Sequence, residues 1–151
     1  MKNLRLGFSF YGLIIVVLQL MPNIICVLFP PELNSLEGTS SSTPFIEYGE
    51  HILQVTIVIL LVFLVNKTQE RRIPRGLSTN VSFSAVALYW LCWVLYFSSI
   101  QPLLIIYAMV ILPPVAFFSA GAAQKIYPIS GASVLLLVFH LTVAFENFPI
   151  G

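Results

Sequence analysis

Aspartate is absent from this chain of 151 residues, and charged residues of every kind make up only 9% of it. Soluble domains carry about a quarter charged residues, so this sequence has too few to cover a surface that faces water. Hydrophobic residues make up 58% of the chain, and no polar stretch is long enough to form a second unit. The composition therefore predicts an integral membrane protein with a single domain over residues 1–151.

The sequence also lacks the common signatures of catalysis. It has no Walker motif, no HExxH, no GxSxG and no glycine-rich phosphate loop. Its two cysteines, Cys26 and Cys92, form no CxxC pair, so the sequence lacks the usual motif for thiol–disulfide exchange. His51, His140 and the glutamates show no metal-ligand spacing. We therefore expect no catalytic set, no cofactor and no metal ion, and we expect no nucleic-acid partner.

Apolar runs without charge set the number of membrane spans. About twenty helical residues cross the hydrocarbon core of a bilayer. The charge-free run over 76–124 is more than twice that length, so it must turn back, and Ser98-Ser99-Ile100-Gln101-Pro102 is the plausible turn. We predict an all-α, polytopic bundle of five transmembrane helices, at about 6–29, 45–65, 81–97, 102–123 and 129–145.

The basic residues fall on one side of this arrangement. They precede the first span, lie in the segment 66–80 or lie in the last turn: Lys2, Arg5, Lys67, Arg71, Arg72, Arg75 and Lys125. Five of the six glutamates fall in the alternate segments, and Glu70 is the exception. The positive-inside rule therefore predicts a cell-membrane protein with a cytoplasmic N-terminus and an extracytoplasmic C-terminus. Residues 66–80 become a basic cytoplasmic loop, and 30–44 become an outer loop.

Polar residues inside the spans are costly and therefore informative. Glu47, Glu50, His51 and Gln54 share one face of the second span, and the same face carries Val58 and Leu61 deeper in the membrane. This pattern predicts a vestibule in the outer leaflet with an apolar floor.

Two other spans bring polar residues to the same depth. The first contributes Gln19 and Asn23, and the last contributes His140 with Glu146 and Asn147 at its outer end. The candidate binding residues are Asn23, Glu47, Glu50, His51, Gln54, His140, Glu146 and Asn147. Such residues serve either interhelical hydrogen bonding or a binding site, and the sequence leaves both readings open.

The fourth span contains Pro113-Pro114, which predicts a helix kink. Small residues at 119–123 and 130–133 predict close packing of the fourth and fifth spans. The aromatic residues of the third span, from Tyr89 to Phe97, predict an interfacial belt with a packing face.

Several short motifs resemble one group of proteins. Met21-Pro22-Asn23-Ile24-Ile25, Pro30-Pro31 and Glu50-His51-Ile52-Leu53-Gln54 are followed by Ile111-Leu112-Pro113, Tyr127-Pro128, His140 and Glu146-Asn147. With these motifs at similar spacing, most of the chain resembles an uncharacterised group of small multipass membrane proteins of bacteria. The resemblance implies a membrane location and no activity. The chain departs from the group at Leu53, where a glycine is usual.

Three functions remain open at this level. The leading hypothesis is a non-enzymatic membrane protein whose outer-leaflet polar cluster packs helices or binds a lipid, a solute or a partner. The first alternative is a small oligomeric transporter, supported by Pro113-Pro114. The second is a membrane-embedded enzyme in which Glu50 or Glu47 works with His140 as an acid–base pair. The expected partners are membrane lipid and either further copies of the chain or another membrane protein.

The charge distribution makes a prediction about topology. Cysteines introduced at Ser41 and Gly151 should react with an impermeant thiol reagent added to intact cells, and a cysteine at Ser78 should not. Labelling at Ser78 would contradict the predicted orientation. So would a glycan on Asn66 or Asn80, which both lie in sequons on the predicted cytoplasmic side.

Overall fold

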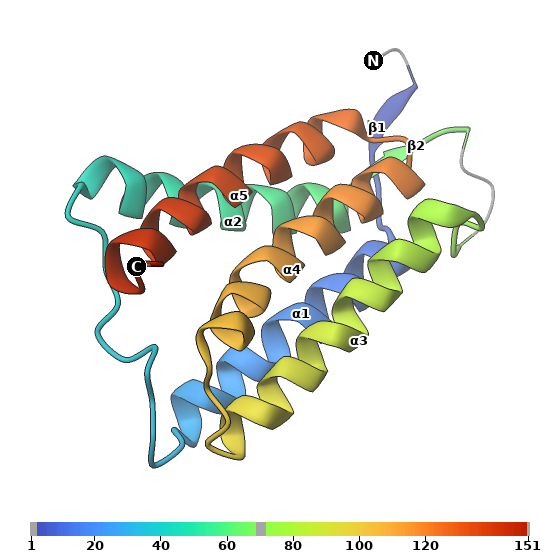
Figure 1. Ribbon diagram of the computed structural model, residues 1–151. Coiled ribbons are helices and arrows are strands. Elements are labelled where there is room, and N and C mark those ends of the chain that lie inside the picture. The colour runs from blue at the N-terminus through green and yellow to red at the C-terminus, as the bar shows by residue number, and fades with distance from the viewer. Residues whose placement is uncertain (1–2, 69–71, 151) are drawn as a thin grey trace.

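The protein is a bundle of five helices (Figure 1), seen in a computed structural model that describes residues 3–68 and 72–150. The helices are α1 (Phe10–Leu28), α2 (Pro44–Phe63), α3 (Leu77–Phe97), α4 (Leu103–Ala123) and α5 (Tyr127–Asn147). All five are long and apolar enough to cross a membrane. The prediction of an all-α protein with five spans is therefore confirmed, while the expectations for Lys2, Glu70, Arg71 and Gly151 lie outside the described residues.

A short two-stranded sheet is the main departure from the predicted spans. Strands β1 (Leu4–Leu6) and β2 (Leu64–Asn66) pair antiparallel, with Leu4 opposite Asn66. Because these residues are extended, α1 begins after the predicted boundary at residue 6 and α2 ends before the predicted boundary at 65. The pairing supplies backbone hydrogen bonds where each helix meets the loop region, so it replaces helical turns without leaving the backbone unpaired.

Two other boundaries differ from the sequence-based prediction. The predicted basic loop 66–80 is shorter, because α3 starts at Leu77 rather than at Val81. The fifth helix begins at Tyr127, with Pro128 in its first turn, and continues to Asn147. Proline is well tolerated at that position because the first backbone N–H groups of a helix have no intrahelical acceptor.

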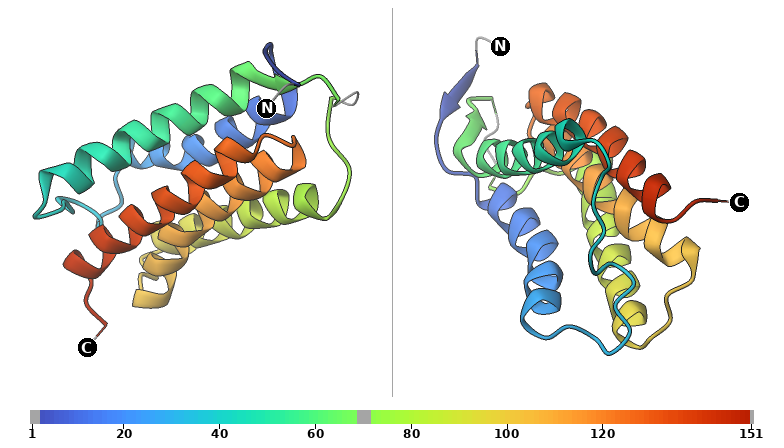
Figure 2. Two further views of the ribbon diagram at one scale, coloured as in Figure 1. Left: turned by 90° about the horizontal axis from the view of Figure 1, so that it is seen from above. Right: turned by 90° about the vertical axis from the view of Figure 1, so that its left-hand side faces the viewer.

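The bundle closes at one end and opens at the other. Helix α4 is the most buried, and it packs along both α3 and α5. Helices α1 and α2 approach each other near β1 and β2 and then separate, as Figure 1 and the right-hand view of Figure 2 show. The α1–α2 loop, residues 29–43, bridges the separated ends.

Charge is divided between the two ends of the bundle. The described basic residues surround the strands, the start of α3 and the α4–α5 turn, and we call this the basic end: Arg5, Lys67, Arg72, Arg75 and Lys125. Asn66 ties this end together by donating to the backbone carbonyl of Lys125 over 3.0 Å. Five glutamates lie in the α1–α2 loop, the first turns of α2 or the last turn of α5, which together form the acidic end: Glu32, Glu37, Glu47, Glu50 and Glu146. Which end faces the cytoplasm stays a prediction.

The main apolar core draws on all five helices and includes the place where α1 and α2 meet. Tyr11, Ile15, Ile57 and Leu61 are fully buried there. The closest approach is at Gly12, where an added Cβ would collide with the backbone carbonyl of Leu61. Only a residue without a side chain permits this separation, as is common at interfaces between membrane helices.

The expected close packing of α4 on α5 is also present. A Cβ on Gly121 would lie 2.9 Å from the Cβ of Ile129, and the Ser130 hydroxyl donates to the Phe118 carbonyl over 2.9 Å. Gly131, in contrast, faces open space.

These glycines give a stability prediction. Gly12→Ala should lower the free energy of unfolding by about 1–3 kcal/mol, because α1 and α2 would have to move apart. Gly131→Ala is the matched control, and it should be neutral or slightly stabilising because alanine favours a helix over glycine. Thermal unfolding of both purified proteins in the same detergent checks the difference. Equal midpoints would mean that α1 and α2 do not pack this closely.

Candidate functional site

A cavity of about 410 Å³ lies between the diverging helices, and we call it the acidic-end cavity. All five helices and the α1–α2 loop line it: Gln19, Leu20, Asn23, Leu36, Thr39, Glu50, Gln54, Val58, Tyr89, Trp93, Met109, Val110, Pro113, Phe117, His140, Val143, Ala144 and Phe148. Pockets for small molecules commonly measure about 300–1,000 Å³ and combine apolar walls with a few polar groups. The acidic-end cavity fits that description.

The structure brings three predicted residues into contact at this cavity. The Nδ1 atom of His140 lies 3.0 Å from an Oε1 atom of Glu50, and both side chains are mostly buried. The contact lacks the alignment of a hydrogen bond, since His140 Nδ1 has no hydrogen-bond partner. On the other side of the ring, Gln54 Nε2 lies 3.5 Å from His140 Nε2, the outer limit for a hydrogen bond. These contacts join α2 to α5.

A second polar contact joins α1 to α3. The Tyr89 hydroxyl donates to Oδ1 of Asn23 over 3.0 Å, and Asn23 Nδ2 donates to the backbone carbonyl of Gln19 over 3.4 Å. Asn23 therefore lines the same cavity as Glu50, Gln54 and His140, as the sequence predicts, although it contacts none of them.

Two further side chains on the cavity wall have polar atoms without partners. Gln19 is only 2% exposed, and neither its Oε1 nor its Nε2 has a hydrogen-bond partner. Trp93 is 4% exposed, and its Nε1 lies near the Tyr89 hydroxyl without the alignment of a full hydrogen bond. Each buried, unsatisfied polar group costs about 1–3 kcal/mol of stability. Unpaired groups that share a cavity are the groups that a bound molecule would satisfy.

The prolines of α4 add backbone acceptors to the same wall. The helix continues through Pro113 and Pro114, and both rings are buried. Neither residue has an N–H group, so the carbonyls of Met109 and Val110 lack their usual helical donors. Among the described residues, no side chain donates to either carbonyl. Met109, Val110 and Pro113 all line the cavity. The part of α4 in which the prolines remove helical hydrogen bonds therefore lies at the site.

Proline in α1 shows how such a carbonyl can be satisfied. Pro22 removes the donor for the carbonyl of Leu18. The indole Nε1 of Trp90 donates to that carbonyl over 2.8 Å, replacing the missing N–H. The freed carbonyl of α1 therefore has a donor from the neighbouring helix, whereas the two freed carbonyls of α4 have no side-chain donor among the described residues.

The apolar floor predicted for this site is present. Val58 lines the cavity, and Leu61, one turn deeper on α2, is fully buried. On the other helices the layer below the cavity contains Ile15 and Ala120, both fully buried. This layer separates the acidic-end cavity from the basic end.

The remaining predicted residues lie outside the cavity. Glu146 accepts hydrogen bonds from the Ser41 hydroxyl and from the backbone N–H of Ser42, both 2.9 Å long, and from the Ser42 hydroxyl over 3.1 Å. Asn147 donates to the Ser40 carbonyl over 2.8 Å. These two residues hold the α1–α2 loop in place, and they do not line the acidic-end cavity with the other candidate residues.

The second span does not present its four polar residues together. His51 is exposed on the outside of α2, and Glu47 is half-buried without lining the cavity. The arc that contains Glu47, Glu50, His51 and Gln54 is wider than the contact face between α2 and α5. Only Glu50 and Gln54 fall within that face.

The α1–α2 loop is also tied to the α3–α4 turn. Gln101 donates to the Leu33 carbonyl and accepts from the backbone N–H of Ser35 over 3.2 Å. The Tyr96 hydroxyl donates to Asn34 Oδ1 over 2.7 Å and accepts from the backbone N–H of Leu36 over 2.9 Å. Leu36 lines the cavity, so the loop forms part of its wall.

Sequence reasoning missed Gln19, Tyr89 and Trp93 as site residues. Gln19 stands one helical turn before Asn23 in an otherwise apolar stretch, and that spacing was the available signal. Tyr89 and Trp93 were expected in an interfacial belt with a packing face, and both are buried between helices, on the packing face. An aromatic side chain serves a belt and a core equally well, so its sequence position does not separate the two.

The charge of the lining limits the chemistry of the site. Among the described residues that line the cavity, none is lysine or arginine, and Glu50 is the single acid. No group of three or more His, Cys, Asp or Glu side chains within the described ranges is arranged to hold a metal ion.

No family model, curated protein or solved structure matches this chain. The resemblance to a group of bacterial membrane proteins stays a prediction.

The loop contacts give a prediction for Glu146. Glu146→Ala removes three hydrogen bonds from the α1–α2 loop, so protease cleavage within residues 30–43 should become several-fold faster. Thermal unfolding of the bundle should change little, because the carboxylate is exposed. Glu47→Ala is the control, since Glu47 is another acidic-end glutamate without a hydrogen bond to the described part of the loop. Equal cleavage rates in both variants would mean that Glu146 does not hold the loop.

Proposed function

We propose that this protein is a non-enzymatic membrane protein that binds a small, uncharged amphipathic molecule in the acidic-end cavity. The observation that carries the proposal is the pair of buried, unpaired side chains, Gln19 and Trp93, on the wall of one cavity. Interhelical packing accounts for the Tyr89–Asn23 and Gln54–His140 contacts, because in each a polar group meets a partner on another helix. Packing does not account for polar atoms that meet none.

The available groups define the chemistry of the ligand. Trp93 Nε1 and Gln19 Nε2 are free donors, suited to a carbonyl, ether or hydroxyl oxygen. Gln19 Oε1 and the carbonyls of Met109 and Val110 are acceptors, suited to a hydroxyl or amide donor. The described part of the lining offers no lysine or arginine to neutralise a phosphate or carboxylate, so a charged acidic headgroup would be buried there without their support. A neutral lipid or a similar molecule meets these requirements.

The location of the site follows from the charge distribution. With the basic end in the cytoplasm, the acidic-end cavity lies in the outer leaflet of the cell membrane. The apolar outer surface of the helices would be covered by further copies of the chain, by a membrane partner or by lipid.

The structure bears on the two alternative functions. For a transporter, the buried layer that contains Ile15, Leu61 and Ala120 would have to open, whereas a binding protein requires no such movement. For an enzyme, Glu50 and His140 lie close enough for acid–base chemistry. Among the described residues that line the cavity there is no cysteine or serine to act as a nucleophile with them, and the hydroxyl of Thr39 is bonded to the Leu36 carbonyl.

A substitution at Gln19 tests the proposal. Gln19→Met has a similar size but removes both unpaired polar atoms. In protein washed free of small molecules, we expect its free energy of unfolding to rise by about 1–3 kcal/mol, because a buried cost is removed. Native mass spectrometry of unwashed protein should show a co-purifying small molecule on the wild type and much less of it on Gln19→Met.

The matched control is Gln101→Met, which changes a glutamine whose amide is hydrogen-bonded to the α1–α2 loop. It should lower stability slightly and leave the co-purifying molecule in place. A wild-type protein without any such molecule, combined with a Gln19→Met variant that is less stable, would contradict the proposal. That result would mean that Gln19 contributes to packing.

A further inference from the structure

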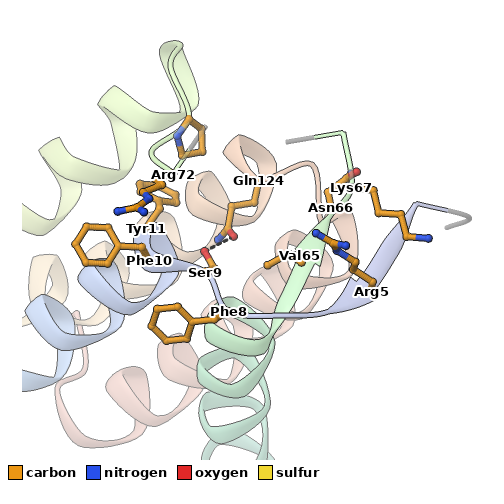
Figure 3. A pocket seen from close by; sticks show the side chains of 11 residues that line it. Arg5, Phe8, Ser9, Phe10, Tyr11, Val65, Asn66, Lys67, Arg72 and Gln124 are labelled. Atoms are coloured by element: carbon orange, nitrogen blue, oxygen red, sulfur yellow. Dashed lines mark hydrogen bonds between the residues drawn. The ribbon is translucent and has the colours of Figure 1, made fainter. Parts of the chain in front are cut away.

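A second cavity lies at the basic end, independent of the proposed function, and we call it the basic-end pocket. Its volume is also about 410 Å³, and Figure 3 shows the side chains that line it. They come from both strands, the start of α1, the segment before α3 and the α4–α5 turn. The fully buried layer around Ile15 separates it from the acidic-end cavity.

Three cations converge on this pocket from separate parts of the chain. Arg5 belongs to β1, Lys67 follows β2, and Arg72 lies in the segment before α3. Figure 3 shows Arg72 on the side of Tyr11, with Arg5 and Lys67 on the opposite side. No acidic residue is among the described residues that line the pocket. This described lining is therefore positively charged, which favours a bound anion.

The floor of the pocket offers a neutral donor. Gln124 is 4% exposed, and its Nε2 has no hydrogen-bond partner. Its Oε1 accepts the hydroxyl proton of Ser9 over 2.7 Å, while Ser9 Oγ accepts from the backbone N–H of Gly12 over 2.9 Å. Because the Ser9 proton is directed at the amide oxygen, the amide NH₂ is the group left free. This buried NH₂ group would be satisfied by an acceptor oxygen in the pocket.

Apolar side chains flank the same pocket. Phe8 is 60% exposed and Phe10 is 48% exposed, and both line it beside the cations. Exposed aromatic rings next to basic residues are typical of the region where headgroups and acyl chains meet. They would contact the chains of a lipid whose headgroup occupies the pocket.

We propose that the basic-end pocket binds a phosphate group. Arg5, Lys67 and Arg72 supply its charge neutralisation, and Gln124 donates to one of its oxygens. Arginine suits this role because its planar guanidinium can donate two parallel hydrogen bonds to one phosphate. The phosphate comes either from the headgroup of an anionic phospholipid or from free inorganic phosphate, and the two sources share this recognition chemistry.

Lipid titration of the full-length protein in detergent tests the proposal. Native mass spectrometry should show adducts of dioleoyl phosphatidylglycerol at several-fold lower concentration than adducts of dioleoyl phosphatidylcholine. Gln124→Glu keeps the acceptor for Ser9 but places a carboxylate on the pocket floor, so it should weaken phosphatidylglycerol binding at least tenfold. Arg72→Gln should weaken binding roughly fivefold, as expected for one cation near a membrane surface. Arg75→Gln removes a basic-end cation outside the pocket, and it should leave binding close to wild type.

Sodium phosphate added to the lipid-bound protein distinguishes the two sources. Displacement of phosphatidylglycerol at millimolar phosphate would support free phosphate as the ligand, and retention of the lipid would support the phospholipid. Arg72 is exposed, so Arg72→Gln reports on binding even if Gln124→Glu fails to fold. The proposal is overturned if Arg72→Gln and Arg75→Gln bind phosphatidylglycerol equally, or if phosphatidylcholine binds as well as phosphatidylglycerol.

Discussion

Every polar group inside a bilayer must find its partner within the protein, because hydrocarbon offers none. Most of this structure obeys that constraint. Trp90 donates to the carbonyl that Pro22 leaves unpaired, Ser9 caps α1, and the β1–β2 pairing continues backbone hydrogen bonding where α1 and α2 end. The exceptions among the described residues include Gln19 and Trp93 on the wall of one cavity and Gln124 on the wall of the other, whereas the buried Thr79 hydroxyl lines neither. We propose a ligand only where such unpaired groups line a cavity.

The two cavities differ in the charge around them. The acidic-end cavity has one carboxylate close to an imidazole and otherwise neutral groups, whereas the basic-end pocket has three cations. A neutral occupant suits the first and an anionic occupant suits the second. The acidic-end cavity depends on the divergence of α1 and α2, whereas the basic-end pocket lies beside the strands, where these two helices are close together. The close contact at Gly12 and the buried layer around Ile15 lie between the two sites.

The number and order of the helices could be predicted because a bilayer fixes the length of an apolar run. The β1–β2 pair could not, since three residues in each strand give too short a pattern. Within the site, Asn23, Glu50, Gln54 and His140 were identified because polar residues are rare in these spans. Glu47 and His51 fall outside the cavity because only part of their arc on α2 faces α5, and Glu146 and Asn147 because they bond to the α1–α2 loop. Both facts depend on tertiary packing, which a helical pattern does not show.

The α1–α2 loop has a consequence for the kinetics of exchange. Hydrogen bonds hold it to the end of α5 and to the α3–α4 turn, and two of its residues, Leu36 and Thr39, line the acidic-end cavity. If the proposed occupant enters and leaves past this loop, the opening of these bonds sets its rates of entry and exit together, whereas the side chains of the helices set how tightly it is held.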